Sequence, residues 1–129
     1  MQDIRHAVTQ FGQSLGLQDF SMGIDGSARI KLKNGEILGF EALDDGLMIS
    51  RVIPTPFVST QMLVSALRLA NARQNANPMA IHVGLKGSGN DAAIVVSQRL
   101  DRSDPSPSEI AQAVSHIQTW FHQWQGLAR

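Results

Sequence analysis

The spacing of apolar residues changes period several times along the chain, and the order of these changes restricts the folds that it can adopt. Over residues 3–15 apolar positions recur every three or four residues, which predicts a helix that Gly16 ends. Over residues 20–53 they recur every second residue, between turns of the Asp-Gly and Asn-Gly type. This pattern predicts an antiparallel meander of three or four strands, the first of them at residues 20–24.

A second helix is predicted at residues 60–73, and it is apolar around most of its circumference. Its polar strip is narrow and consists of Gln61, Ser65 and Arg68. In a chain of 129 residues one sheet covers only one side of such a helix. The remaining apolar side therefore predicts a subunit interface, and a fully internal helix is the alternative.

The last part of the chain predicts a hairpin and a third helix. A polar loop is expected at residues 71–78, before two strands that alternate from Met79 and from Ala92. Ser106 to Glu109 has the spacing of a capping box, with proline at the first helical position. The predicted fold is α+β: helix, antiparallel meander, helix, β-hairpin and helix, with three helices packed on a twisted antiparallel sheet in one domain, 1–129.

Composition excludes several functional classes. Eleven Lys+Arg balance eleven Asp+Glu, so the chain lacks the basic field that a nucleic-acid-binding protein needs. The chain has no cysteine, which excludes disulfides, thiolate catalysis and cysteine-ligated metals. The N-terminal residues show no secretory signal, and the apolar runs are far too short for a membrane helix, so a cytoplasmic location is expected.

No catalytic or metal-binding constellation is identified, and neither a cofactor nor a metal is predicted. None of the four histidines forms a pair spaced i, i+4 that would bind one metal, so structural or surface roles are favoured. They are His6, His82, His116 and His122.

The segment Gly84–Gly89 has the lysine before its Gly-Ser-Gly, whereas a phosphate-binding loop has the lysine after its glycines. The segment is therefore expected to be a hairpin tip. Asp44-Asp45 fits a turn, and Trp120 and Trp124 fit packing along the last helix. A hydrolase would need a histidine–carboxylate pair formed only by the fold.

An ordered set of short motifs over most of the chain resembles the class I type III secretion chaperone family, the small dimeric, Tir-chaperone-like chaperones of secreted bacterial effectors. The set comprises Phe11-Gly12-Gln13-Ser14-Leu15-Gly16-Leu17, the Asp-Gly and Asn-Gly turns, Leu67-Arg68-Leu69-Ala70-Asn71, the late hairpin, and Trp124 before Leu127.

The resemblance implies a non-enzymatic, cytoplasmic virulence chaperone without a cofactor. It would bind the N-terminal segment of a type III secreted effector in extended form and keep that segment secretion-competent, and the family pattern implies a homodimer. For the effector contact we expect the apolar residues Leu17, Phe20, Met22, Met48 and Val52. For the dimer interface we expect five residues of the second helix, Met62, Leu63, Ala66, Leu69 and Ala70.

Two features depart from the family pattern. Members that serve a single effector are usually markedly acidic, whereas this chain has a formal net charge of zero. A chaperone of several effectors, or one half of a heterodimer with a related chaperone, is therefore also open. Gly23 stands in the predicted first strand, where a β-former is expected. The alternative function, from another class, is a small regulatory or ligand-sensing binding domain with an internal pocket.

Overall fold

The computed structural model describes residues 4–32, 34–76, 81–101 and 104–127. Within these ranges the chain forms three α-helices, five strands and one short 3-10 helix. In chain order they are α1 (Ile4–Ser14), β1 (Ser27–Lys31), β2 (Ile37–Leu43), β3 (Gly46–Pro54), α2 (Thr60–Ala76), β4 (Ile81–Lys86), η1 (Gly89–Asp91), β5 (Ala93–Leu100) and α3 (Pro107–Leu127). The order of helix, meander, helix, hairpin and helix confirms the predicted α+β fold.

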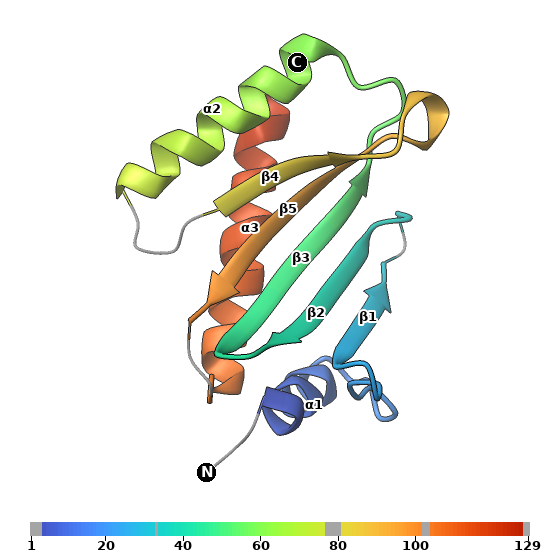
Figure 1. The fold of residues 1–129 in the computed structure, drawn as a ribbon, viewed down its shortest axis with the longest axis vertical. Coiled ribbons are helices and arrows are strands. Elements are labelled where there is room, and N and C mark those ends of the chain that lie inside the picture. Colours follow the sequence, from blue (N-terminus) through green and yellow to red (C-terminus); the bar gives the residue numbers. More distant parts are fainter. Residues whose placement is uncertain (1–3, 33, 77–80, 102–103, 128–129) are drawn as a thin grey trace.

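The five strands form one antiparallel sheet in the order β1-β2-β3-β5-β4, so that β1 and β4 are its edges. Helix α3 runs along one face of the sheet, α1 packs against α3 and β2, and α2 lies beside the β4 edge and α3 (Figure 1). None of these three helices covers the opposite face of the sheet, which we call the open face.

The core lies between the sheet and α3, and it is filled by the side chains that the strands direct toward the helices. Large apolar side chains alternate toward the helices along the central strands. They are Leu38 and Phe40 of β2, Leu47, Ile49 and Ile53 of β3, and Ile94, Val96 and Leu100 of β5. Ile110, Ile117, Trp120 and Trp124 supply the facing side of α3. These apolar residues of α3 recur at helical spacing and therefore lie on the one face of the helix that packs against the core.

Helix α1 ends in a Schellman motif, as Gly16 predicted. The amide of Gly16 donates to the Gln13 carbonyl and the amide of Leu17 donates to the Gly12 carbonyl, both at 3.0 Å. Gly16 has a φ of +85°, a conformation that glycine adopts without a steric penalty. The motif reverses the chain and directs residues 17–22 back toward the sheet.

The strand predicted at residues 20–24 does not form, and this prediction is wrong. The amide of Gly23 bonds to the Ser27 carbonyl at 2.8 Å, and Asp25 accepts the Ser27 amide at 3.1 Å. These local bonds make a tight turn, so the chain doubles back before a strand can extend. Ile24 is fully exposed as a result, which breaks the alternation that the sequence indicated.

The polar loop predicted at residues 71–78 is helical as far as Ala76, because α2 continues through it. The segment Asn71–Ala76 contains alanine, arginine and glutamine, which have good helix propensity. Residues 77–80, and with them Met79, lie outside the described residues.

The predicted capping box at the start of α3 is confirmed. Ser106 Oγ accepts the Glu109 amide at 3.1 Å, and a Glu109 carboxylate oxygen accepts the Ser106 amide at 3.2 Å.

Candidate functional site

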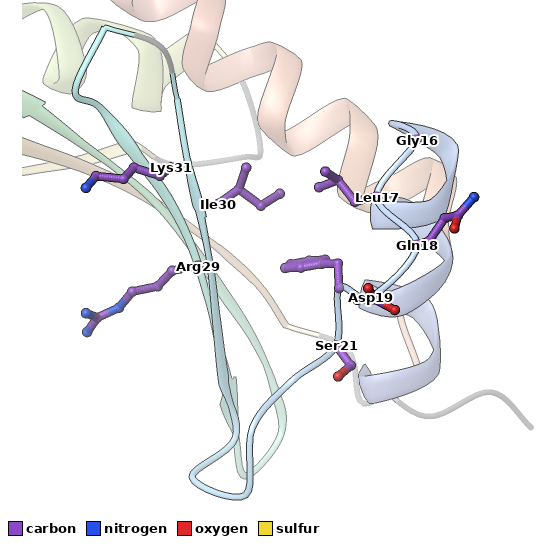
Figure 2. A pocket seen from close by; sticks show the side chains of 9 residues that line it. Gly16, Leu17, Gln18, Asp19, Ser21, Arg29, Ile30 and Lys31 are labelled. Carbon is purple, nitrogen blue, oxygen red and sulfur yellow. The ribbon is translucent and has the colours of Figure 1, made fainter.

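A cavity lies between the loop after α1 and the free edge of β1. It measures about 710 Å³, and we call it the edge groove. Its lining consists of Gly16, Leu17, Gln18, Asp19, Phe20, Ser21, Arg29, Ile30 and Lys31. Figure 2 shows Ile30 pointing from β1 toward Leu17, while Arg29 and Lys31 point to the other side of the strand. One side of the strand is therefore apolar and faces the groove, and the other side is cationic.

Packing below the loop fixes the groove floor. The Phe20 ring meets the buried Phe40 ring edge-on, with centroids 5.9 Å apart. Phe40 in turn packs against Phe11 of α1 at 5.7 Å. Gly12 leaves the space that Phe20 occupies, because a Cβ at residue 12 would lie only 2.4 Å from the Phe20 ring. The α1 motif thus positions a groove residue that lies outside the helix.

The β1 edge offers free backbone hydrogen-bonding groups to the groove. Gly26 bonds to Ala42 at 2.8 Å and Leu32 bonds to Glu36 at 2.8 Å, and these pairs bracket β1. In an antiparallel ladder hydrogen-bonded pairs alternate, so Ala28 and Ile30 also bond toward β2. Arg29 and Lys31 consequently direct their N–H and C=O groups away from β2, toward the groove.

The chemistry of this site is that of a binding surface. The described residues contain no cluster of three or more His, Cys, Asp or Glu side chains that could hold a metal. Near the groove, hydrogen bonds from the Ser27 hydroxyl and amide lower the pKa of Asp25, which stabilises its charged form at the turn before β1. Free backbone groups beside an apolar floor suit an added β-strand.

The structure brings only some of the predicted effector-contact residues together. Leu17 and Phe20 line the edge groove. Met22 follows them in the same loop but is 7% exposed, within the core. Met48 and Val52 are half-buried on β3, and their strand register places them on the open face, away from the groove. The predicted residues therefore belong to two separate surfaces and one core position.

The open face carries a second apolar feature that the strand register defines. Ile37 pairs with Val52, and Val52 pairs with Val95, so three aliphatic side chains form a row across β2, β3 and β5. All three are half-buried, although none of the described helices lies over them. Met48 stands on the same face, opposite Glu41 and Arg99.

Sequence reasoning missed the two groove features that β1 contributes, the side chain of Ile30 and the free backbone edge. The alternation of Ala28 and Ile30 with Arg29 and Lys31 is typical of a half-buried strand. Strand order, and hence which strand lies at an edge, is a tertiary property. The sequence alone did not show that β1 is unpaired on one side.

The predicted interface residues of α2 mostly face this chain's own core. Ala66 and Ala70 are buried, at 0% and 4% exposure. Met62, Leu63 and Leu69 are half-buried and pack against the core cluster. Among the α2 residues whose side chains are described, Val64 and Leu67 are large, apolar and exposed, at 37% and 46%. Ser65, part of the predicted polar strip, instead accepts the indole N–H of Trp124 at 2.9 Å.

Comparison with solved structures identifies the fold. SycH, a type III secretion chaperone of Yersinia pestis solved in complex with a stable fragment of YscM2, matches with a TM-score of 0.65 and 15% identity over 90% of this chain and 95% of that chain. A chain of the HopA1–SchA chaperone–effector complex matches with a TM-score of 0.63 and 18% identity over 93% and 91%. This chain has the fold of the type III secretion chaperones.

The same fold also occurs in a protein of another description. YbjN from E. coli, a proposed transcription regulator, matches with a TM-score of 0.54 and 14% identity over 89% of this chain and 83% of that chain. No protein-family model matches the chain, and a search of curated proteins finds no match. None of the helices in the described ranges is long and apolar enough to cross a membrane.

Proposed function

We propose that this chain is a non-enzymatic cytoplasmic chaperone of type III secreted effectors, which acts without a cofactor. It binds the N-terminal segment of an effector in extended form and keeps that segment ready for secretion. The observation that carries the proposal is the edge groove: an unpaired strand edge beside an apolar floor, on the fold of the type III secretion chaperones.

The edge groove supports binding of an extended segment in two ways. The N–H and C=O groups of Arg29 and Lys31 bond to a strand laid beside β1, and Leu17, Phe20 and Ile30 receive its alternate side chains. Apolar burial contributes roughly 25 cal/mol per Å², which offsets part of the entropy lost when the segment is ordered. A segment that leaves one groove can continue over the aliphatic row of the open face, where Val52 and Met48 lie.

A homodimer supports the same function by presenting two edge grooves to one effector segment. Val64 and Leu67 of α2 are the exposed apolar residues that such an interface would bury, with the half-buried Met62, Leu63 and Leu69 beside them. β4 is the edge strand nearest to α2. Two linked sites increase the effective concentration of the second contact, so avidity exceeds the affinity of one groove. A heterodimer with a related chaperone would use the same surface.

The test is co-purification of the tagged full chain with N-terminal fragments of type III effectors. We expect at least one fragment to co-purify, and we expect limited proteolysis to show that it lacks a globular fold in the complex. Phe20→Ser should abolish the interaction, whereas Lys86→Ala, a change at the far sheet edge, should retain it. Failure of every fragment, or binding that Phe20→Ser leaves unchanged, would contradict the proposal.

A small regulatory or ligand-sensing binding domain is the second candidate, and the structural likeness to YbjN is the observation that favours it. In that case the edge groove would take a small molecule rather than a polypeptide. Mass spectrometry of a denaturing extract separates the two proposals. A stoichiometric small molecule whose retention depends on Phe20, together with no effector binding, would favour the regulatory role.

A further inference from the structure

The side chains of β1 are apolar on one side of the strand and cationic on the other. Ile30 faces the edge groove, while the exposed Arg29 and Lys31 point to the open face (Figure 2). Neither cation takes part in any ion pair of the described residues. The ion pairs within those ranges are Arg51 with Glu36, and Arg99 with Asp45 and Asp101.

The groups around the two cations differ. The cross-strand row of Lys31 continues through Ile37, Val52 and Val95, none of which is charged. Arg29 stands opposite Gly39 of β2, and Glu41, two residues further along β2, lies on the same face of the sheet. The charge of Arg29 also interacts electrostatically with the Asp25 carboxylate. Lys31 is therefore the less compensated of the two charges, and we expect its contribution to the binding of an anion to be larger.

An added strand must match the alternation of β1. Residues that pair with Arg29 and Lys31 place their side chains on the same face as the two cations, with Cβ atoms about 5 Å away. The residue between them points to the other face, into the groove lined by Leu17 and Phe20. Opposite charges in directly paired positions stabilise a sheet, and like charges destabilise it.

Building on the proposed function, we infer that the edge groove selects a strand in which apolar residues alternate with acidic ones. The apolar residues fill the groove, and the carboxylates face Arg29 and Lys31. The ligand class is thus an extended polypeptide segment with an acidic face. Arg29 and Lys31 are two of the eleven basic residues that balance the eleven acidic residues of this chain. The assignment gives these two cations a physical role.

The test uses three fluorescent peptides of about twelve residues, long enough to cover the β1 edge. All three carry valine at alternate positions and differ only at two central outward positions, which hold glutamate, serine or lysine. Anisotropy titration with the full chain should show the glutamate peptide binding about three- to tenfold more tightly than the lysine peptide, with serine between them. Raising the salt concentration should reduce that difference.

Three variants control the result. Arg29→Glu with Lys31→Glu should reverse the order of the peptides, whereas Lys86→Glu, on the other edge strand, should retain it. Phe20→Ser should weaken all three peptides equally, because it alters the apolar floor and not the charge. Equal binding of the three peptides that still depends on Phe20, or tightest binding of the lysine peptide, would overturn the charge rule while the proposed function stands. No binding of any peptide would overturn this inference, and the effector fragments would then decide the proposed function separately.

Discussion

Gly12 determines where Phe20 can lie, although the two residues belong to different segments. A Cβ on Gly12 would approach Cδ2 of Phe20 to 2.4 Å, far inside van der Waals contact. Phe20 in turn packs on Phe40 and forms part of the groove floor. A helix residue without a side chain therefore shapes the candidate binding surface.

Gly12→Ala should displace Phe20 and lower the free energy of unfolding by about 1–3 kcal/mol, as overpacking does in other cores. It should also weaken binding at the edge groove. Gly126→Ala is a matched control, because Gly126 lies in α3 with open space around its Cβ position. There alanine should stabilise the protein by about 0.5–1 kcal/mol. Urea unfolding measures both effects, and equal stabilisation by the two changes would contradict this account.

A buried ion pair sits at the end of the core, next to α3. Arg51 Nε donates to a Glu36 carboxylate oxygen, and the side chains are 12% and 6% exposed. Asn34 donates to the second carboxylate oxygen. The Arg51 guanidinium also lies over the Phe121 ring, 5.5 Å from its centroid. Each charge here depends on its partner, because burial removes most of its hydration.

Glu36→Ala should lower the free energy of unfolding by about 3 kcal/mol, because it leaves the Arg51 charge buried without its carboxylate. The double change Glu36→Leu with Arg51→Met removes both charges and should cost much less than the single change. Chemical unfolding of the native chain, Glu36→Ala, the single changes Glu36→Leu and Arg51→Met, and the double variant forms the test. If the double variant lost as much stability as the sum of its single changes, the two side chains would not be coupled.

At the scale of elements, local signals in the sequence predicted most of the fold. The Gly16 cap, the capping box at Ser106 and Glu109, and the hairpin glycines are all set by backbone rules that act within a few residues, and each lies where it was expected. The wrong strand at residues 20–24 failed because local bonds around Asp25 overrode an alternation of only three apolar residues.

The orientation of α2 could not be predicted, because it depends on a contact between distant residues. Trp124 of α3 donates its indole N–H to Ser65 Oγ at 2.9 Å and to the Met62 carbonyl at 3.2 Å. This bond turns Ser65 inward, although its polarity indicated solvent. Ala66 and Ala70 consequently face the core, and Leu67 faces outward. The exposed edge of β1 was hidden for the same reason, since strand order joins distant segments.

Trp124→Phe should remove the hydrogen bond that joins α3 to α2, at a cost of about 1 kcal/mol, and should also lose packing, because the buried indole stacks on Trp120. Ser65→Ala should cost about 1 kcal/mol in the native chain but little more in the Trp124→Phe variant, because each change removes the same bond. Thermal unfolding of the two single variants and the double variant measures this coupling. Strictly additive losses would show that Ser65 and Trp124 act independently.

Across the whole molecule, the described residues form one sheet with helices on one face and two edge strands, β1 and β4, whose surroundings differ. The β1 edge borders the edge groove, and the β4 edge borders α2 with its exposed Val64 and Leu67. This separation lets one edge bind a ligand while the other side meets a second copy. The proposed function therefore assigns one surface to each role.

Leu67→Glu should convert a homodimer to a monomer, because a charge would be buried in the proposed interface. Light scattering at micromolar concentration should give about twice the 14.0 kDa chain mass for the native chain and the single mass for the variant. Arg68→Glu, at the adjacent exposed position of α2, controls for the general effect of a new carboxylate. A native chain that scatters as a monomer would rule out the homodimer.

Hydrogen exchange on the complex with an effector fragment is the sharpest test of strand addition at β1, because exchange reports on the backbone groups that an added strand would cover. We expect the amides of Arg29 and Lys31 to become protected on binding, together with one short stretch of the fragment, while the rest of the fragment exchanges as an unfolded chain. Unchanged exchange at Arg29 and Lys31 in a complex that forms, or a fragment protected throughout as a folded domain, would contradict this expectation.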